Sequence, residues 1–185
     1  MSEQRKTYAD LKDELLITRD QIAVRVKKMG AEITRDFEGK DLTVICILKG
    51  AVVFFVDLIR EIDLPMTMDF MAISSYGSAT KSSGVVRILK DLDKPINGKD
   101  VLIIEDIVDS GMTLSFLKEN LLSRGAASLH IATLLDKPER RRVPLHVDYS
   151  GFTIPDEFVV GYGLDYAEKY RNLPDIGVLR PEIYE

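Results

Sequence analysis

The stretch VLIIEDIVDSGMT, Val101 to Thr113, decides how the rest of the chain is interpreted. Its first four residues are apolar, three of them are β-branched, and they lead directly into Glu105 and Asp106. A short apolar run without polar alternation is typical of a strand buried in a parallel sheet. The following segment has the spacing of a helix that ends near Gly125, with three leucines on one face: Leu114, Leu117 and Leu121. The acidic residues are therefore expected in a strand-to-helix loop at the carboxyl end of a strand, where open α/β sheets bind ligands.

The loop that ends this stretch has the composition of an anion-binding turn. Ser110 and Gly111 permit a tight turn with a positive φ at Gly111. Backbone N–H groups from Asp109 to Thr113 then converge at the helix start, where the hydroxyls of Ser110 and Thr113 assist. This arrangement favours a phosphate monoester. The alternative is an ordinary strand-to-helix turn in which the acidic residues cap the helix.

The acidic residues before the turn indicate a second group on the same ligand. Glu105 and Asp106 would repel a phosphate, but they suit the hydroxyl pair of a ribose or a hydrated Mg²⁺. Asp109 lies between the two groups and is free for proton transfer. A phosphate nest beside a diol and metal site predicts that the chain binds a phosphorylated ribose.

Composition limits the class of protein. The 185 residues are 45% apolar and 30% charged, as in a soluble globular chain, and the net charge of −5 argues against nucleic acid as the main partner. The N-terminus has no secretory apolar segment, and no run of 18 apolar residues indicates a membrane span. Cys46 is the single cysteine and lies in an apolar run, so we expect a buried structural thiol in a reducing cytoplasm.

The rest of the chain predicts alternating helices and strands. A helix from Thr18 is expected to weaken or break near Gly30, and the helix at 51–62 is apolar enough to be core or to join subunits of a homodimer or homotetramer. Residues 74–84 hold five serines and two glycines, which indicates either a disordered loop tip or a lid. The tail from about Val147 to Tyr184 departs from the alternation and predicts a cap. Further strands are expected at 42–48, 67–73, 85–92 and 128–135.

Taken together, VLIIEDIVDSGMT resembles the phosphoribosyl pyrophosphate (PRPP) signature of the type I phosphoribosyltransferases. The flanking sequence, from about Thr43 to Leu179, is similar to the hypoxanthine/guanine branch. The resemblance implies an α/β fold with a central, mostly parallel sheet flanked by helices, a small C-terminal hood and a flexible lid hairpin. It also implies one phosphoribosyltransferase domain over 1–185, with a core of about 35–140 and a hood of about 1–15 and 145–185.

The implied activity is purine salvage. Such enzymes convert hypoxanthine or guanine and PRPP to IMP or GMP and pyrophosphate, with Mg²⁺ as cofactor. The implied partners are therefore PRPP and a 6-oxopurine, without nucleic acid or membrane. Asp109 is the expected general base, taking a proton from the purine ring as the base attacks the ribose.

The resemblance also assigns the binding residues. Lys49 and Gly50, after a peptide bond that similar enzymes often hold cis, are expected to bind pyrophosphate with Ser75, Tyr76 and Arg171. The 5′-phosphate is expected on the backbone and hydroxyls of five consecutive residues: Asp109, Ser110, Gly111, Met112 and Thr113. Met112 departs from several relatives, which carry a basic residue there.

The purine and the metal are assigned in the same way. Lys137 is expected to recognise the exocyclic oxygen of the purine, Phe158 to stack on its ring and Val159 to bind its edge. Asp165 is assigned both to the base and to the metal. Glu105 and Asp106 complete the metal set. The run from Arg140 to Arg142 is interpreted as solvated.

Other interpretations fit less well. The chain lacks the P-loop motif, and Gly161-x-Gly163 lacks the third glycine and the long helix of a dinucleotide site. The main alternative is a PRPP-sensing transcriptional or RNA-binding regulator with the same fold. Such a regulator needs a basic face or an added DNA-binding domain. The sequence is too short for the second, and only residues 137–142 suggest the first.

Overall fold

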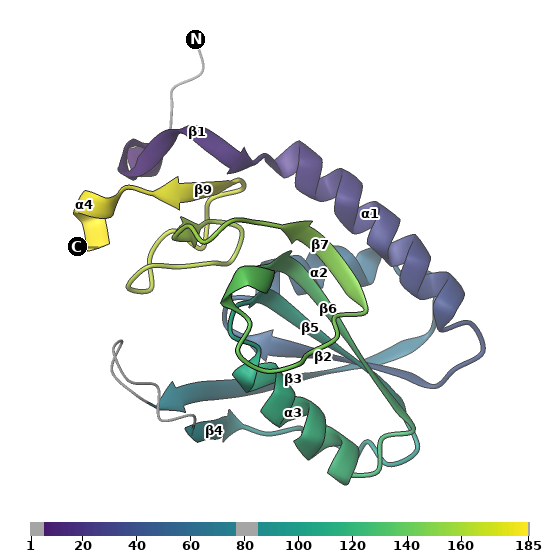
Figure 1. The fold of residues 1–185 in the computed structure, drawn as a ribbon. Coiled ribbons are helices and arrows are strands. Elements are labelled where there is room, and N and C mark those ends of the chain that lie inside the picture. Colours follow the sequence, from purple (N-terminus) through teal and green to yellow (C-terminus); the bar gives the residue numbers. More distant parts are fainter. Residues whose placement is uncertain (1–5, 77–84, 185) are drawn as a thin grey trace.

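The computed structural model describes residues 6–76 and 85–184. Within these residues a six-stranded sheet has the order β4-β3-β2-β5-β6-β7, in which β4 is antiparallel to β3 and the other neighbours are parallel (Figure 1). This confirms the predicted α/β class with a mostly parallel sheet. The strands are β2 (Leu42–Leu48), β3 (Met66–Tyr76), β4 (Val85–Lys90), β5 (Asp100–Val108), β6 (Ser128–Asp136) and β7 (Tyr149–Thr153).

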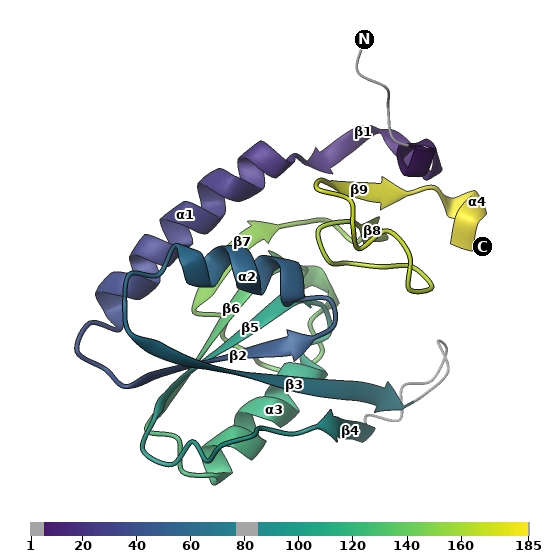
Figure 2. The same cartoon turned by 180° about the vertical axis from the view of Figure 1, so that it is seen from behind.

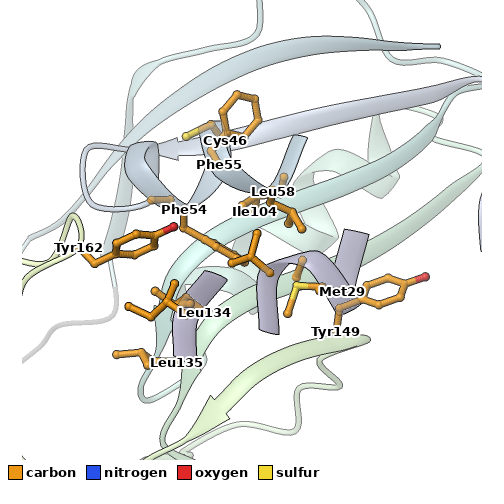
Figure 3. Packing of buried hydrophobic residues seen from close by; sticks show 14 of the residues in the cluster. Met29, Cys46, Phe54, Phe55, Leu58, Ile104, Leu134, Leu135, Tyr149 and Tyr162 are labelled. Carbon is orange, nitrogen blue, oxygen red and sulfur yellow. The ribbon is translucent and has the colours of Figure 1, made fainter. Parts of the chain in front are cut away.

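Helices cover both faces of this sheet. On one face lie α1 (Arg19–Asp36) and α2 (Val52–Arg60), and on the other lies α3 (Met112–Ser123) (Figure 2). Figure 3 shows the first interface, where Phe54 and Leu58 of α2 and Met29 of α1 pack around Ile104 of β5. Because β2 and β5 are covered on both faces, their apolar residues run without alternation. Two short 3₁₀ segments lie outside this core, Lys6–Asp10 at the start of the described chain and Pro138–Arg140 after β6.

The predicted break at Gly30 is wrong, because α1 continues through it to Asp36. The N-terminal prediction is confirmed, since Thr18 caps the helix and exchanges hydrogen bonds with Gln21. Gly30 is instead needed because no side chain fits between α1 and the end of α2. A Cβ there would lie 2.5 Å from Cβ of Glu61 and 2.6 Å from its carbonyl oxygen. The glycine therefore permits close approach of α1 to the end of α2.

A smaller sheet forms the hood over the carboxyl edge of the main sheet. It has the antiparallel order β1-β9-β8, with β1 at Leu11–Ile17, β8 at Val159–Val160 and β9 at Ile176–Leu179, followed by α4 (Pro181–Tyr184). The two ends of the described chain thus meet in one sheet (Figure 1). One apolar cluster belongs to the hood and contains Leu11, Val160, Tyr170, Leu173 and Leu179. Other residues of the hood strands, Ile17, Val159, Ile176 and Val178, pack into the core beneath α1 and α2.

Two boundaries differ from those predicted. β5 runs on to Val108, so Glu105 and Asp106 lie on the strand itself and not in the loop. Strand pairing to β6 extends through Val108, which pairs with Asp136, and this holds the acidic segment extended. β7 pairs with β6 in the main sheet, although its residues fall in the range 145–185 expected for the hood. Residues 77–84 of the expected lid lie outside the described part of the chain. Among the described residues, no helix is long and apolar enough to cross a membrane.

Candidate active site

A pocket of about 320 Å³ opens between the carboxyl edge of the main sheet and the hood. The turn after β2, the end of β5, the start of α3 and the long loop between β8 and β9 all contribute walls. The pocket brings together ten of the predicted site residues: Lys49, Gly50, Glu105, Asp106, Asp109, Ser110, Gly111, Thr113, Asp165 and Arg171. It does not include Met112, Lys137, Phe158 or Val159.

Residues 109–113, here called the phosphate loop after the role expected for them, form the predicted tight turn at the start of α3. Gly111 has a φ of 79° and immediately precedes α3, and no side chain caps that helix. The N–H groups of the first helical turn therefore face the pocket edge without an intrahelical partner. The Met112 N–H lies 3.4 Å from Oγ of Ser110. Because Ser110, Gly111 and Thr113 line the pocket, this turn can hold an anion through backbone and hydroxyl donors.

The acidic pair on β5 is buried beside the phosphate loop. Glu105 is 9% exposed, and its Oε1 accepts the Asp106 N–H at 3.1 Å. Burial and the neighbouring Asp106 carboxylate raise the pKa of Glu105 well above its usual range, and burial raises the pKa of Asp106. Two neighbouring buried carboxylates can be compensated by the hydroxyl donors of a ligand or by a hydrated cation. Both the ribose diol and Mg²⁺ fit this donor set.

Gly50 fixes the position of one of these acids. A Cβ at Gly50 would overlap Oδ2 of Asp106 and lie 2.8 Å from its Cγ. A Cβ at Gly163 would in turn overlap the carbonyl oxygen of Gly50. The hood at Gly163, the turn at Gly50 and strand β5 at Asp106 therefore pack together without room for a side chain at either glycine. The peptide bond between Leu48 and Lys49 is cis, in agreement with the hypothesis drawn from similar enzymes, although the sequence does not decide it.

Two cations across the pocket share one carboxylate. Glu168 lies between Lys49, whose Nζ is 2.9 Å from Oε2, and Arg171, whose Nη2 is 3.5 Å from Oε1. Arg171 also contacts Asp165 at 2.8 Å and donates to the Gly163 carbonyl at 2.8 Å. Its Nε is buried without a partner among the described residues. The Glu168 side chain is exposed, and Arg171 still has one N–H group unpaired within the described part of the chain. An incoming ligand anion can therefore replace the Glu168 carboxylate between the two cations.

Glu105, Asp106 and Asp165 are predicted to hold the metal, but no cluster of three possible metal ligands occurs among the described residues. Asp165 differs from the two acids on β5 because both of its oxygens have partners in the hood. Its Oδ1 pairs with Arg171, and its Oδ2 accepts the Glu168 N–H at 2.8 Å. These two donors keep the Asp165 carboxylate in the hood and away from the acidic pair on β5.

The predicted purine residues lie together on the hood side of the phosphate loop. Lys137 is 9% exposed, and its Nζ donates to the Glu157 carbonyl at 2.7 Å. Phe158 is 39% exposed and stacks on Tyr184 with ring centroids 4.8 Å apart. Val159 is buried in β8, where its backbone pairs with β9. The side chains of Ser75 and Tyr76 lie outside the described residues, although the backbone of both belongs to β3.

The basic run after Lys137 is solvated at Arg140 and Arg142, as expected, but Arg140 and Arg141 also form ion pairs that the sequence does not predict. Arg140 Nε donates to Oδ1 of Asp109 at 3.0 Å, and Arg140 Nη1 donates to Oδ2 of Asp156 at 3.2 Å. Arg141 pairs with Asp136. The only sequence signal for these contacts is that three arginines directly follow a lysine assigned to the site. Spacing alone does not say which acid each one reaches.

The family follows from comparison with known proteins. The sequence pattern described as "Phosphoribosyl transferase domain" matches residues 16–167. The chain belongs to this family. It is 54% identical to the "Hypoxanthine-guanine phosphoribosyltransferase" of Bacillus subtilis over 173 residues, which cover 94% of this chain and 96% of that protein. The crystal structure of a "Hypoxanthine Phosphoribosyltransferase" from Staphylococcus aureus superimposes with a TM-score of 0.95 at 51% identity, covering 99% of both chains.

These relatives confirm the resemblance to the hypoxanthine/guanine branch of the phosphoribosyltransferases. A further relative is longer. The "Bifunctional protein TilS/HprT" of Listeria innocua is 53% identical over 171 residues, which cover 92% of this chain. The chain spans only 26% of the length of that bifunctional protein. A similar domain therefore also occurs as one part of a longer, bifunctional protein.

Proposed function

We propose that this chain is a purine salvage enzyme that transfers the 5-phosphoribosyl group of PRPP to hypoxanthine or guanine. The products are IMP or GMP and pyrophosphate. The observation that carries the proposal is the pocket, in which the phosphate loop and the buried acidic pair of one strand-to-helix connection face the cation Arg171. A 5′-phosphate, a ribose diol and a pyrophosphate follow one another in the same order along PRPP.

The PRPP side of the pocket binds and orients the donor. The backbone and hydroxyls of the phosphate loop hold the 5′-phosphate, including Met112 through its backbone only. Lys49, Gly50 and Arg171 bind pyrophosphate together with Ser75 and Tyr76. As the C1′–O bond breaks, these donors stabilise the charge that collects on the leaving pyrophosphate, while positive charge develops on the ribose ring.

Mg²⁺, when bound, neutralises charge on the pyrophosphate oxygens. Glu105 and Asp106 would hold it, directly or through its water, and their burial side by side supports this role. Asp165 is proposed as a further ligand on the purine side, and it must then leave Arg171. Since Mg²⁺ in such sites keeps several waters and takes oxygens from phosphate, a closed protein cage is not required.

The purine is oriented by the hood. Lys137 donates to the exocyclic oxygen at C6, and its ammonium group has donors to spare beyond the Glu157 carbonyl. Phe158 stacks on the ring and the Val159 backbone binds its edge, with Asp165 nearby. Adenine is disfavoured because Lys137 would face an amine. Asp109 takes the proton from the ring nitrogen N7 while N9 forms the bond to C1′. The purine product is therefore neutral at N7, and pyrophosphate leaves with the electrons of the C1′–O bond.

The assembly and location of the enzyme are part of the proposal. We place it in a reducing cytoplasm, which suits the free, buried thiol of Cys46. A homodimer or homotetramer is supported by Val52 and Val56, which leave an apolar strip of α2 exposed. Sedimentation of the purified protein tests the assembly.

The regulator alternative has less support. Arg140 and Arg141, which would form its basic face, are engaged with the carboxylates of Asp109, Asp156 and Asp136. An arginine paired in this way adds little positive field for a nucleic acid.

The test is pyrophosphate release from PRPP and Mg²⁺ with hypoxanthine, guanine, xanthine, adenine or uracil. We expect turnover with a 6-oxopurine. Asp109→Asn should reduce this turnover roughly 10²–10⁴-fold while PRPP binding persists. Asp63→Asn, at the opposite edge of the sheet after α2, is the matched control and should leave kcat unchanged. Binding of PRPP without turnover of any base would overturn the proposal and direct the work to RNA and DNA binding.

A further inference from the structure

The loop that follows β6 lies along the phosphate loop and contacts it at several points. Backbone N–H groups of Lys137 and Arg142 donate to carbonyl groups in or beside the phosphate loop, each at 2.9 Å. Arg141 Nη1 donates to the carbonyl of Asp109 at 3.1 Å. A Cβ at Gly111 would lie 3.0 Å from Cδ of Arg141, so the two loops are in close contact at the start of α3 (Figure 1). The purine side and the phosphate side of the site are thus joined by backbone.

Arg140 adds a charged link between the same two loops. Its Nε donates to Oδ1 of Asp109 at 3.0 Å and its Nη1 to Oδ2 of Asp156 at 3.2 Å. The other oxygen of Asp156 lies 3.5 Å from Nζ of Lys137. Charges therefore alternate along one chain of side chains, from the proposed general base at one end to the purine-recognising lysine at the other.

We propose that Arg140 is a positioning residue for Asp109, anchored by Asp156, and that this network sets the base in register with the purine held by Lys137. The proposal rests on the function proposed above and adds a residue to it. A guanidinium is planar, so its hold on Oδ1 fixes the plane of the Asp109 carboxylate and leaves Oδ2 to receive the purine proton. Asp156 accepts a hydrogen bond from Nη1 on the other side of the guanidinium and so restricts rotation of the Arg140 side chain.

Charge and exposure separate this role from a contribution to folding. The side chains of Arg140, Asp109 and Asp156 are 47%, 46% and 47% exposed, and ion pairs at such positions stabilise the fold little. Asp109 and Asp156 raise the pKa of Arg140, so its guanidinium stays charged at any assay pH. A variant at Arg140 should therefore fold normally, and its defect should appear in turnover.

The experiment is steady-state kinetics of Arg140→Gln with hypoxanthine and PRPP. We expect kcat to fall roughly three- to thirty-fold, because a misaligned base costs rate without costing donor affinity. The KM for PRPP and the melting temperature should stay near the wild-type values. Arg140→Lys should recover part of kcat, since one ammonium reaches Asp109 but cannot also hold Asp156 in the same geometry.

Asp156→Asn tests the anchor. It should lower kcat in the same direction, and the double variant with Arg140→Gln should be no slower than the worse single variant, because residues of one network act as a unit. Arg35→Gln is the control, since it removes a similar pair, Arg35 Nε to Asp36 Oδ1 at 2.9 Å, on α1 away from the pocket. It should leave kcat unchanged.

Wild-type or higher kcat in Arg140→Gln would overturn the positioning role, as would a loss confined to the KM for PRPP or matched by a fall in melting temperature. Additive losses in the double variant would overturn the network. In each of these cases the proposed function still stands if the wild-type enzyme is active and Asp109→Asn is not. Absence of turnover in the wild type is the separate failure of that function.

Discussion

At the scale of single residues, the site depends on a position with no side chain. Gly50 lies against Asp106 so closely that a methyl group would overlap the carboxylate. The atoms that the methyl group would meet first belong to the end of the Asp106 side chain, so the protein can relieve the overlap by rotating Asp106 away. The fold then survives at the expense of the acidic pair.

We predict that Gly50→Ala weakens binding of Mg²⁺ and PRPP by at least roughly ten-fold while the protein stays folded. The reason is displacement of the Asp106 carboxylate from the pocket wall. Calorimetric titration of PRPP with Mg²⁺, with a thermal melt on the same sample, measures both effects. Asp106→Asn provides the comparison and should weaken binding similarly. Wild-type affinity in Gly50→Ala would contradict the close packing seen at this turn.

Cys46 shows how burial controls a titrating group. It is fully buried in β2, and burial, followed by the charges of Glu105 and Asp106, raises its pKa from 9.0 to about 12. The raised pKa means that the folded thiol keeps its proton at a pH where the unfolded thiol has lost it. Its stabilising contribution is therefore complete below pH 9.0 and is lost as the pH rises toward about 12.

We predict that wild-type protein loses more stability than Cys46→Ala when the pH is raised from about 8 to about 10.5, by up to roughly 2 kcal/mol. Denaturant unfolding of both proteins at the two pH values measures the difference, and other titrating groups cancel in the comparison. The folded wild type should also resist thiol reagents at about pH 8. Equal pH slopes for the two proteins would show that the thiol ionises alike in both states.

At the scale of helices and strands, the sequence predicts what local pattern controls. Mostly apolar runs identify β2, β5 and β6, and Thr18 with Gln21 identifies the start of α1. What depends on a distant partner is not predictable. Pairing with β6 extends β5 past the acids, and Arg140 finds Asp109 only because the loop after β6 folds back. Likewise the candidate site is recognisable by its motifs, but the links between them are not.

Gly30 is the clearest such case, and it gives a prediction. In an exposed helix, glycine to alanine stabilises by about 1 kcal/mol, but here the new Cβ would strike the backbone of Glu61 at the end of α2. We predict that Gly30→Ala destabilises the protein by about 1–3 kcal/mol in denaturant unfolding. Ala31→Gly, at the exposed neighbouring position, is the control and should cost only the propensity term. Stabilisation by Gly30→Ala would mean that α1 and α2 can separate freely.

At the scale of the whole molecule, the site is divided between two sheets. The six-stranded sheet carries the phosphate loop and the acidic pair, and the hood carries Asp165 and Arg171 on the loop between β8 and β9. The hood joins residues from both ends of the chain and has a small apolar cluster of its own, although Ile17, Val159, Ile176 and Val178 pack into the main core. We expect the part around the small cluster to loosen before the main sheet unfolds.

This division gives the last prediction, for Leu11→Ala in β1. Leu11 is 2% exposed and its Cγ would lie 3.3 Å from a Cβ at Gly177 of β9, so truncation removes packing worth about 2–4 kcal/mol from the hood alone. Hydrogen exchange should speed up in β1, β8 and β9 and stay slow in β2, β5 and β6, and turnover should fall as Arg171 loses its support. Leu117→Ala, buried against the other face of the main sheet, is the control and should accelerate exchange in the central strands. A uniform acceleration in Leu11→Ala would instead mean that hood and sheet unfold as one unit, so that the hood could not open to admit substrate without unfolding the strands that bind it.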